Sequence, residues 1–311
     1  MKKRIFFLFI FIILTFVSNA QQESQYSQNT YTQLLTNPGY AGSDGRICAF
    51  ALSRTQWSGF EGAPSVITFN VDGSVKKFGI GVSIENDTYG FEKNLKANLS
   101  LAYKFSLGNG NLGVGLKWGI VNSTIDAKWN AKDDFNSDPA IPIDGSNNTN
   151  FLDFGFGLYY KAEGLYLGIS STHLLESDLE YVNGEGGTTA VPIKRHYYIT
   201  AGYNMPFANP LLEFKPNILM QSDGIKTQLG FTGLFEYNKK LWGGVSLRTD
   251  KAIIGILGAE LFKWVKISYS YDFVVSDMMD YNNGTHEIVM GFCLDVKKDK
   301  TPEKYKSIRF L

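Results

Sequence analysis

The chain has 311 residues, of which 19% are charged and 14% aromatic, and its 30 basic residues balance its 30 acidic ones. This balance provides no basic surface for neutralising phosphates, so nucleic acid is not an expected partner. Two cysteines are too few for a disulfide framework or a multi-cysteine zinc site. A mean hydropathy of -0.12 excludes a bundle of membrane helices but is compatible with a membrane β-barrel, whose strands alternate apolar and polar residues.

The N-terminus has the organisation of a secretory signal peptide. The basic residues Lys2–Arg4 precede the apolar run Ile5–Val17, which is shorter than the about 20 residues that span a bilayer. Ser18 and Ala20 then supply the small residues of a cleavage site. We therefore predict a signal peptide over residues 1–20 and export of the mature chain.

Strict period-2 alternation dominates the mature chain. In the segment Leu95–Ser106 one set of alternate positions is wholly apolar and the other is mostly polar. Such alternation places one face of a strand in an apolar medium and the other against polar or small groups. Fourteen strands are expected, near residues 46–57, 64–72, 77–86, 93–106, 111–123, 151–161, 165–173, 195–204, 212–221, 226–236, 241–248, 252–260, 264–273 and 285–294. They average about ten residues, the length that crosses a bilayer at a tilt, whereas globular strands average about 5–6.

The connections between these strands distinguish a membrane barrel from the alternative, a secreted soluble β-sandwich or propeller. The three long gaps, 124–150, 174–194 and 274–284, all follow odd-numbered strands, whereas the gaps after even-numbered strands are short. Long outer loops and short periplasmic turns produce this asymmetry. Aromatic residues near strand ends are expected to form girdles at the two membrane interfaces; they are Trp57, Tyr103, Trp118, Tyr159, Tyr160, Trp242 and Trp264.

These patterns predict an all-β fold consisting of a single transmembrane antiparallel β-barrel of 14 strands over residues 46–294. We expect periplasmic termini, long outer loops near 124–150 and 174–194, and outer-membrane lipid around the wall. The Gln-rich N-terminal lead, residues 21–45, is expected in the periplasm or in the lumen. The basic C-terminal tail, residues 295–311, is expected in the periplasm. Each could be a disordered extension, a docking element or a plug.

Two features of the inward positions bear on whether the lumen is open. Lys96, Lys104, Lys117 and Glu85 would line a wet lumen, which suits a pore. Small inward residues would instead leave room for a plug supplied by the lead; they are Gly79, Gly81, Gly113, Gly115 and Gly230. Fourteen strands enclose a wider lumen than the eight-stranded barrels that side chains fill.

The chain offers little support for catalysis. His173, His196 and His286 are its three histidines, and no spacing combines a nucleophile with a base held by a third group. The acidic loop Asp133–Asp138 lacks the glycine and glutamate that a calcium loop needs at its sixth and twelfth positions. We predict no catalytic residues, no metal and no cofactor.

The two cysteines lie where the barrel must close, since Cys48 opens the first strand and Cys293 ends the last. Cys48 shares its parity with Phe50, whereas Cys293 has the opposite parity to Phe292. If the apolar residues of both strands face lipid, the two thiols point to opposite faces of the wall. We therefore predict two free cysteines.

Two motifs near the start of the mature chain resemble the PorP/SprF family of Bacteroidetes. Residues 37–43, Asn-Pro-Gly-Tyr-Ala-Gly-Ser, are similar to the family's Asn-Pro-x-Tyr-Ala-Gly-Ser lead. Residues 54–64 are similar to its Arg-x-Gln-Trp-x-Gly-x-x-Gly-Ala-Pro block, and the final strand, which opens with Gly284–Ile288, resembles the family's ending. The motif and tail residues are expected to bind a partner or to structure loops; they are Asn37, Pro38, Tyr40, Arg54, Gln56, Trp57, Gly59, Pro64, Arg309 and Phe310.

The resemblance implies a non-enzymatic outer-membrane component of the type IX secretion system. Such proteins assist general secretion or the export and anchoring of cell-surface adhesins for gliding motility. The implied partners are periplasmic secretion-system or peptidoglycan-linked proteins and a co-encoded surface adhesin. The alternative function is a passive outer-membrane diffusion channel of the porin type.

Overall fold

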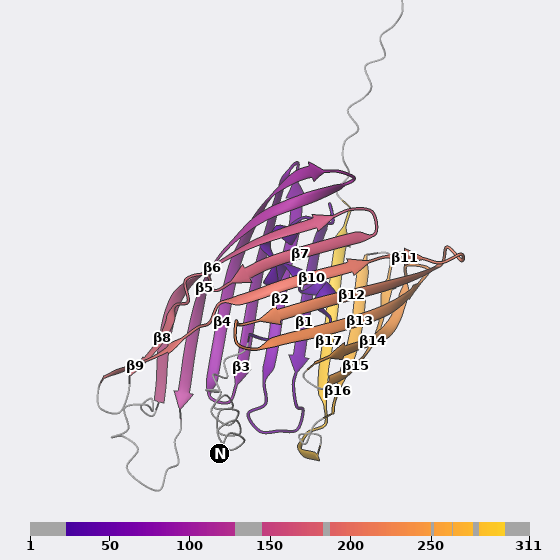
Figure 1. Ribbon diagram of the computed structural model, residues 1–311. Helices are drawn as coiled ribbons and strands as arrows, with labels where there is room; N and C mark the ends of the chain where they lie inside the picture. The colour runs from indigo at the N-terminus through magenta and orange to yellow at the C-terminus, as the bar shows by residue number, and fades with distance from the viewer. Residues whose placement is uncertain are drawn as a thin grey trace, which may run out of the picture.

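The computed structural model describes residues 23–127, 145–182, 187–249, 252–262, 264–275 and 280–295. The expected signal peptide, the tail after residue 295 with Arg309 and Phe310, and the acidic loop 133–138 lie outside these residues. Within them, 14 long antiparallel strands close into one barrel (Figure 1). The barrel strands are β1 (Ile47–Thr55), β2 (Ser65–Val75), β3 (Phe78–Tyr89), β4 (Glu92–Leu107), β5 (Gly110–Ala127), β6 (Gly145–Lys161), β7 (Leu165–Thr172), β10 (His196–Tyr203), β12 (Leu212–Ser222), β13 (Thr227–Tyr237), β14 (Leu241–Arg248), β15 (Ala252–Leu261), β16 (Val265–Val274) and β17 (Thr285–Leu294).

Each predicted strand corresponds to one of these, so the predicted fold is confirmed. β5 and β6, with 18 and 17 residues, extend into the segment expected as a loop. In the other long loop, β8 (Asp178–Val182) and β9 (Thr188–Pro192) form a separate hairpin that was not predicted. β11 (Met205–Pro206) is a two-residue extension paired to β12.

Two pairings between strands distant in the chain or across the long loop complete the circle. β1 pairs with β17 over its full length, and β7 pairs with β10, on either side of the loop that contains β8 and β9, from Leu165↔Tyr203 to Thr172↔His196. The short periplasmic turns lie toward the upper and right-hand edges of Figure 1, where β11 is labelled, and the β8–β9 hairpin lies at the lower left, at the outer end. A closed barrel leaves no strand edge unpaired in the wall.

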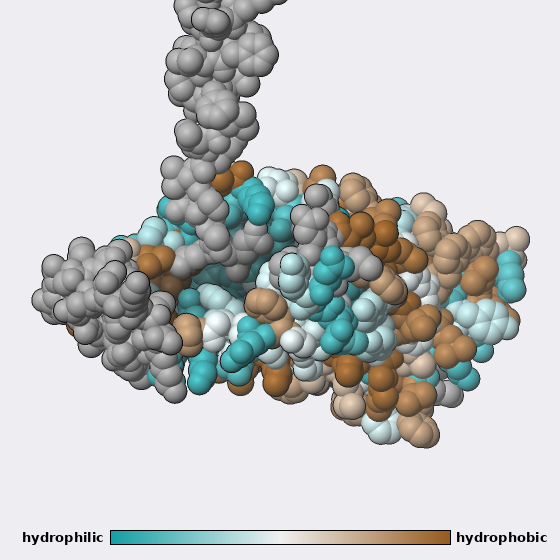
Figure 2. Space-filling model, turned by 90° about the horizontal axis from the view of Figure 1, so that it is seen from below, coloured by the Kyte–Doolittle hydropathy of each residue, from teal (hydrophilic) through white to brown (hydrophobic). Residues whose placement is uncertain are grey.

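The wall is apolar outside and polar or small inside. In β3, Phe78, Ile80, Val82 and Ile84 are 45% to 57% exposed on the outer face, whereas the residues between them are buried toward the lumen. Seen from the outer end, apolar side chains cover much of the barrel flank and polar ones gather around the mouth (Figure 2). This exposed apolar surface is far larger than a soluble protein carries and matches contact with lipid.

The predicted aromatic girdles are partly wrong. Trp118 and Trp264 are exposed on the outer wall, as expected, but Tyr159 and Trp242 are buried on the lumen side. Tyr159 packs edge-on against Tyr40 of the lead at 5.2 Å between ring centroids, and Trp242 lies 6.5 Å from the ring of Tyr31. The sequence pattern assigned them to lipid because nothing local shows that a second apolar surface lies inside the barrel.

That second surface is the lead, which runs inside the barrel from residue 23, near the outer end, to residue 44, near the periplasmic end. It contains three single turns: η1 (Asn29–Tyr31), α2 (Gln33–Thr36) and η2 (Pro38–Tyr40). Among the described residues, no helix has the length and apolar character needed to cross a membrane.

Glycines on the inner face of the wall lie directly against the lead, and we call this surface the floor of glycines. A Cβ at Gly79 would lie 1.9 Å from the carbonyl oxygen of Ala41, and one at Gly115 would lie 2.3 Å from the amide nitrogen of Gly39. Gly113 and Gly157 approach the lead equally closely, whereas Gly230 does not contact it. The inward glycines of β3, β5 and β6 therefore allow the backbones of the lead and the wall to meet.

The prediction of two free cysteines is wrong, because Cys48 and Cys293 form a disulfide. They are directly opposed in the β1–β17 register, with 4.1 Å between their Cα atoms. The phase argument failed on β1, whose apolar residues Phe50 and Leu52 face inward and are buried. Tyr26 and Tyr31 of the lead cover this cluster, so the apolar face of β1 is not the lipid face.

Candidate functional site in the barrel lumen

The predicted Asn-Pro-Gly-Tyr motif forms the corner where the lead rests on β5 and β6. Asn37 is 2% exposed; its side chain donates a hydrogen bond to the Leu158 carbonyl (3.0 Å) and accepts one from the Gly39 amide (2.9 Å). Pro38 begins the η2 turn, where its missing N–H costs no hydrogen bond. Gly39 has no space for a side chain, because a Cβ would lie 2.8 Å from wall carbonyls of Gly113 and Gly157.

The lead leaves the lumen at the periplasmic end through further polar contacts. The Gly42 amide donates to Asp72 of β2 (2.7 Å), its carbonyl accepts from Lys104, and Asp44 forms an ion pair with Lys161. Burial alone would raise the pKa of Asp44, but the cation of Lys161 holds it below the ordinary value. The lysines expected to line a wet lumen are therefore bonded to the lead or to other wall residues.

Arg54, the first residue of the second motif, lies in a buried ionic cluster at the closing seam. Its guanidinium is 2.9 Å from Asp272 of β16 and 3.2 Å from Glu287 of β17, and all three side chains are at most 3% exposed. It also donates to the hydroxyl of Ser27 (2.7 Å). Glu287 in turn accepts the backbone amides of Ser27 (2.9 Å) and Gln28 (2.8 Å), so the cluster fastens the lead to the wall.

The remaining residues of this motif form the first outer loop rather than a lumen site. The Gln56 amide donates to the Pro64 carbonyl (2.9 Å), which closes the loop. Trp57 and Gly59 adopt positive φ values of 50 and 89, and the Trp57 amide donates to Thr285 (3.2 Å). The structure thus separates the motif into Arg54 in the lumen and Gln56 to Pro64 at the outer rim.

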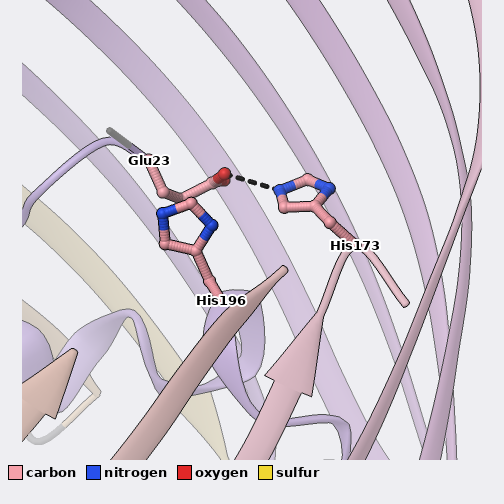
Figure 3. A group of neighbouring side chains, drawn as sticks. All are labelled: Glu23, His173 and His196. Carbon is pink, nitrogen blue, oxygen red and sulfur yellow. Dashed lines mark hydrogen bonds and ion pairs between the residues drawn. The ribbon is translucent and has the colours of Figure 1, made fainter. Parts of the chain in front are cut away.

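The outer end of the lumen holds a network around the first described residue of the lead. The two carboxylate oxygens of Glu23 lie 2.5 Å from Lys96 Nζ and 2.6 Å from His173 Nε2. His173 Nδ1 lies 3.0 Å from Asp153, which also pairs with Lys117 (3.2 Å). His196 stands beside this pair, with its ring centroid 5.9 Å from that of His173 (Figure 3).

Electrostatics favours a charged pair between the lead and the wall here. Burial opposes the ionisation of Glu23 and of His173, but the cations of Lys96 and His173 hold the pKa of Glu23 well below its usual value. Burial likewise lowers the pKa of His173, and the neighbouring Glu23 and Asp153 more than compensate, raising it to about 8. At neutral pH an imidazolium therefore lies between two carboxylates.

Sequence reasoning missed Glu23, Asp153, Asp272 and Glu287. One signal for Asp153, Asp272 and Glu287 was available. Each is a charged residue at an alternate position that faces the lumen, and the lipid-facing positions between such residues are apolar or small. Their partners are 20 residues away in the chain (His173 from Asp153) to 260 residues away (Ser27 from Glu287), so no local spacing could pair them. His286, the third histidine, contacts the Tyr269 hydroxyl (2.7 Å) on the exposed wall, away from the network.

The sequence profile described as Type IX secretion system membrane protein PorP/SprF matches residues 18–292. No curated protein matches the chain. Among solved structures, the chain is similar to the Ralstonia pickettii toluene transporter TbuX, with 12% identity, a TM-score of 0.52, and coverage of 85% of this chain and 93% of that one. It is similar to the Pseudomonas putida toluene transporter TodX, with 11% identity, a TM-score of 0.50, and coverage of 88% and 95%. At these identities the likeness supports the barrel fold alone.

Proposed function

The chain belongs to the PorP/SprF family of type IX secretion system membrane proteins, and from this premise we propose a non-enzymatic role in assisting secretion or surface anchoring of proteins such as gliding adhesins. Membership makes the chain a membrane component of that system, located in the outer membrane. The part in handling adhesins is the proposed refinement. The proposed processing is removal of residues 1–20 as a signal peptide.

One observation carries this proposal: the lumen contains the chain's own lead, fastened to the wall near both of its ends. The Glu23 network, the Arg54 cluster and the Asp44–Lys161 pair are separate anchors along its course. A segment held by the ion pairs of Glu23 and Asp44 and by hydrogen bonds to the Arg54 cluster favours a docking or gated component over a passive diffusion channel, which needs an open water path.

Both ends of the barrel offer surfaces for the proposed partners. At the periplasmic end a cavity of about 440 Å³ is lined by Lys76, Lys77 and Lys161, which suits an acidic surface on a periplasmic secretion-system or peptidoglycan-linked protein. At the outer end, the first outer loop exposes Phe60, and the β8–β9 hairpin exposes Val182. We propose that these outer elements meet a co-encoded surface adhesin.

The test compares the cell-surface and culture-medium proteomes of a strain lacking this gene with those of wild type and of the complemented strain. Loss of one adhesin, reversed by complementation, would support an adhesin-specific role; loss of many exported proteins would support a general one. An unchanged proteome together with slower uptake of small solutes would contradict the proposal and favour the diffusion channel.

A further inference from the structure

The Glu23 network brings together three side chains that are ligands of transition metals. An Nε2 or Nδ1 atom from each of His173 and His196 and a carboxylate oxygen of Glu23 all lie within 4.8 Å of one another. Two imidazoles and one carboxylate make up a common ligand set for zinc, whose bonds to such atoms are about 2.0–2.2 Å long. The three residues come from three segments, the lead, the end of β7 and the start of β10.

The nitrogens that would not bind a metal already have partners. His196 Nδ1 lies 3.0 Å from the carbonyl oxygen of Lys194, which can only accept, so this nitrogen carries the proton and Nε2 has the lone pair. His173 Nδ1 lies 3.0 Å from Asp153, which leaves its Nε2 directed at Glu23. Histidines that bind metals are usually held in this way, with a carbonyl or carboxylate behind the ring.

The two oxygens of the Glu23 carboxylate likewise have different partners. One oxygen contacts Lys96, and the other points toward the imidazole of His173 (Figure 3). A metal would therefore take the second oxygen while Lys96 holds the first. A cavity of about 60 Å³ borders all three ligands, which exceeds the roughly 10–15 Å³ that one water needs. Water could thus complete the coordination of the ion.

We propose that Glu23, His173 and His196 form a binding site for a divalent transition-metal ion of the zinc type, which clamps the start of the lead to the outer end of β7 and β10. The prediction of no metal, made from sequence spacing, is revised by this proposal. Tetrahedral bonds of about 2.0 Å separate ligand atoms by about 3.3 Å. Binding therefore requires the ion to replace the His173 proton and part the 2.6 Å contact with Glu23, while His196 moves closer.

The test uses the mature full-length barrel, purified in detergent without a polyhistidine tag and stripped with a chelator. Zinc is then added, and bound metal is measured by mass spectrometry after desalting; cobalt(II), which absorbs visible light when coordinated, is added to a parallel sample. We expect one equivalent of zinc per chain and a cobalt spectrum typical of nitrogen and oxygen ligands. Both cysteines are in the disulfide, so no thiol competes.

Variants separate this site from adventitious binding. His173→Gln, His196→Gln and Glu23→Gln should each weaken zinc binding by at least about 100-fold, and Asp153→Asn by about 10–100-fold because it supports a ligand. His286→Gln is the matched control, since this histidine lies on the exposed wall, and it should bind zinc as wild type does. Retention of heat-modifiable mobility on gels shows that each variant is folded.

The wild-type spectrum tests the proposal without relying on any variant. If the folded wild-type chain binds no zinc and gives no cobalt spectrum, the proposal is wrong. It is also wrong if His286→Gln removes binding as completely as His173→Gln, because the ion would then be held elsewhere.

Discussion

Arg54 illustrates how a single residue links the lead, the wall and the closing seam. Its guanidinium faces two carboxylates from neighbouring strands, and the seryl hydroxyl of the lead completes the cluster. Arg248 also lies 3.3 Å from Asp272, and burying such charges is costly unless each one is paired and hydrogen-bonded. Here the backbone amides of Ser27 and Gln28 share the negative charge of Glu287, so the lead itself completes the balance.

Replacing Arg54 by Met should therefore destabilise the folded barrel strongly. The change removes the cation of Glu287 and leaves Asp272 with Arg248 alone (3.3 Å), and breaking a buried ion pair in this way typically costs about 3–5 kcal/mol. The heat-modified band on semi-native gels should appear at a clearly lower temperature than in wild type. Lys77→Gln, which removes an exposed lysine at a turn, is the control and should leave that temperature unchanged. Equal stability of Arg54→Met and wild type would mean that the cluster does not support the fold.

At the residue scale, the sequence supported the importance of the motif but not its roles. Asn37, Pro38 and Arg54 were predicted together as partner-binding or loop-structuring residues, and the structure places them on the lead and the inner wall. Their contacts reach Leu158, Asp272 and Glu287, more than a hundred residues away. Only closure of the barrel brings such residues together, and no spacing in one sequence records it.

At the scale of elements, the floor of glycines predicts how the lead can be displaced. Gly115→Ala places a Cβ 2.3 Å from the Gly39 amide nitrogen, so the turn must move by more than a side-chain adjustment. Overpacking of this kind costs about 1–3 kcal/mol. Thermolysin should then cut the lead near Leu34 faster than in wild type, as measured by intact mass after limited digestion. Gly255→Ala is the matched control, because no atom lies within 4 Å of a Cβ built at Gly255, and this variant should digest like wild type. Equal rates of digestion in the two variants would argue against close packing between Gly115 and the lead.

The disulfide between β1 and β17 joins the first barrel strand to the last. A crosslink of this kind typically stabilises by about 2–4 kcal/mol, and the periplasm is oxidising enough to maintain it. We expect a linked peptide pair containing Cys48 and Cys293 in non-reducing mass spectrometry. Reduction should lower the temperature of heat modification in wild type but not in the Cys48→Ser/Cys293→Ser variant, which should already unfold at the lower temperature. Free thiols in the oxidised wild-type chain would contradict this pairing.

The error about the cysteines shows which elements local patterns can predict. Alternation in β3 or β4 reports the lipid face correctly, because the inward residues of these strands are polar or small. β1, β6 and β14 meet two apolar media, lipid outside and the aromatic rings of the lead inside. For these strands parity alone cannot assign the faces, and Cys48, Trp242 and Tyr159 were assigned wrongly for the same reason.

At the scale of the whole molecule, strand number, strand length and loop asymmetry all follow from patterns within single segments. They could therefore be predicted one segment at a time. The course of the lead could not, since a polar segment in the lumen and one in the periplasm have the same composition. The inward glycines gave the one local hint, because a wall lined with glycine leaves space that something must fill. Four of the five glycines identified in this way lie against the lead in the structure.

The position of the lead predicts the electrical behaviour of the intact barrel. In planar bilayers the wild-type chain should show little steady conductance, whereas a folded variant lacking residues 21–45 should form stable ion channels, because a 14-stranded wall encloses more space than its own side chains fill. Heat-modifiable mobility must show that the shortened barrel is closed. A synthetic peptide of residues 21–45 should then reduce the conductance of the shortened barrel, and a scrambled peptide of the same composition should not. Large steady conductance of wild type, equal to that of the shortened chain, would mean that ions pass the lead freely, and the lumen would then serve diffusion rather than docking.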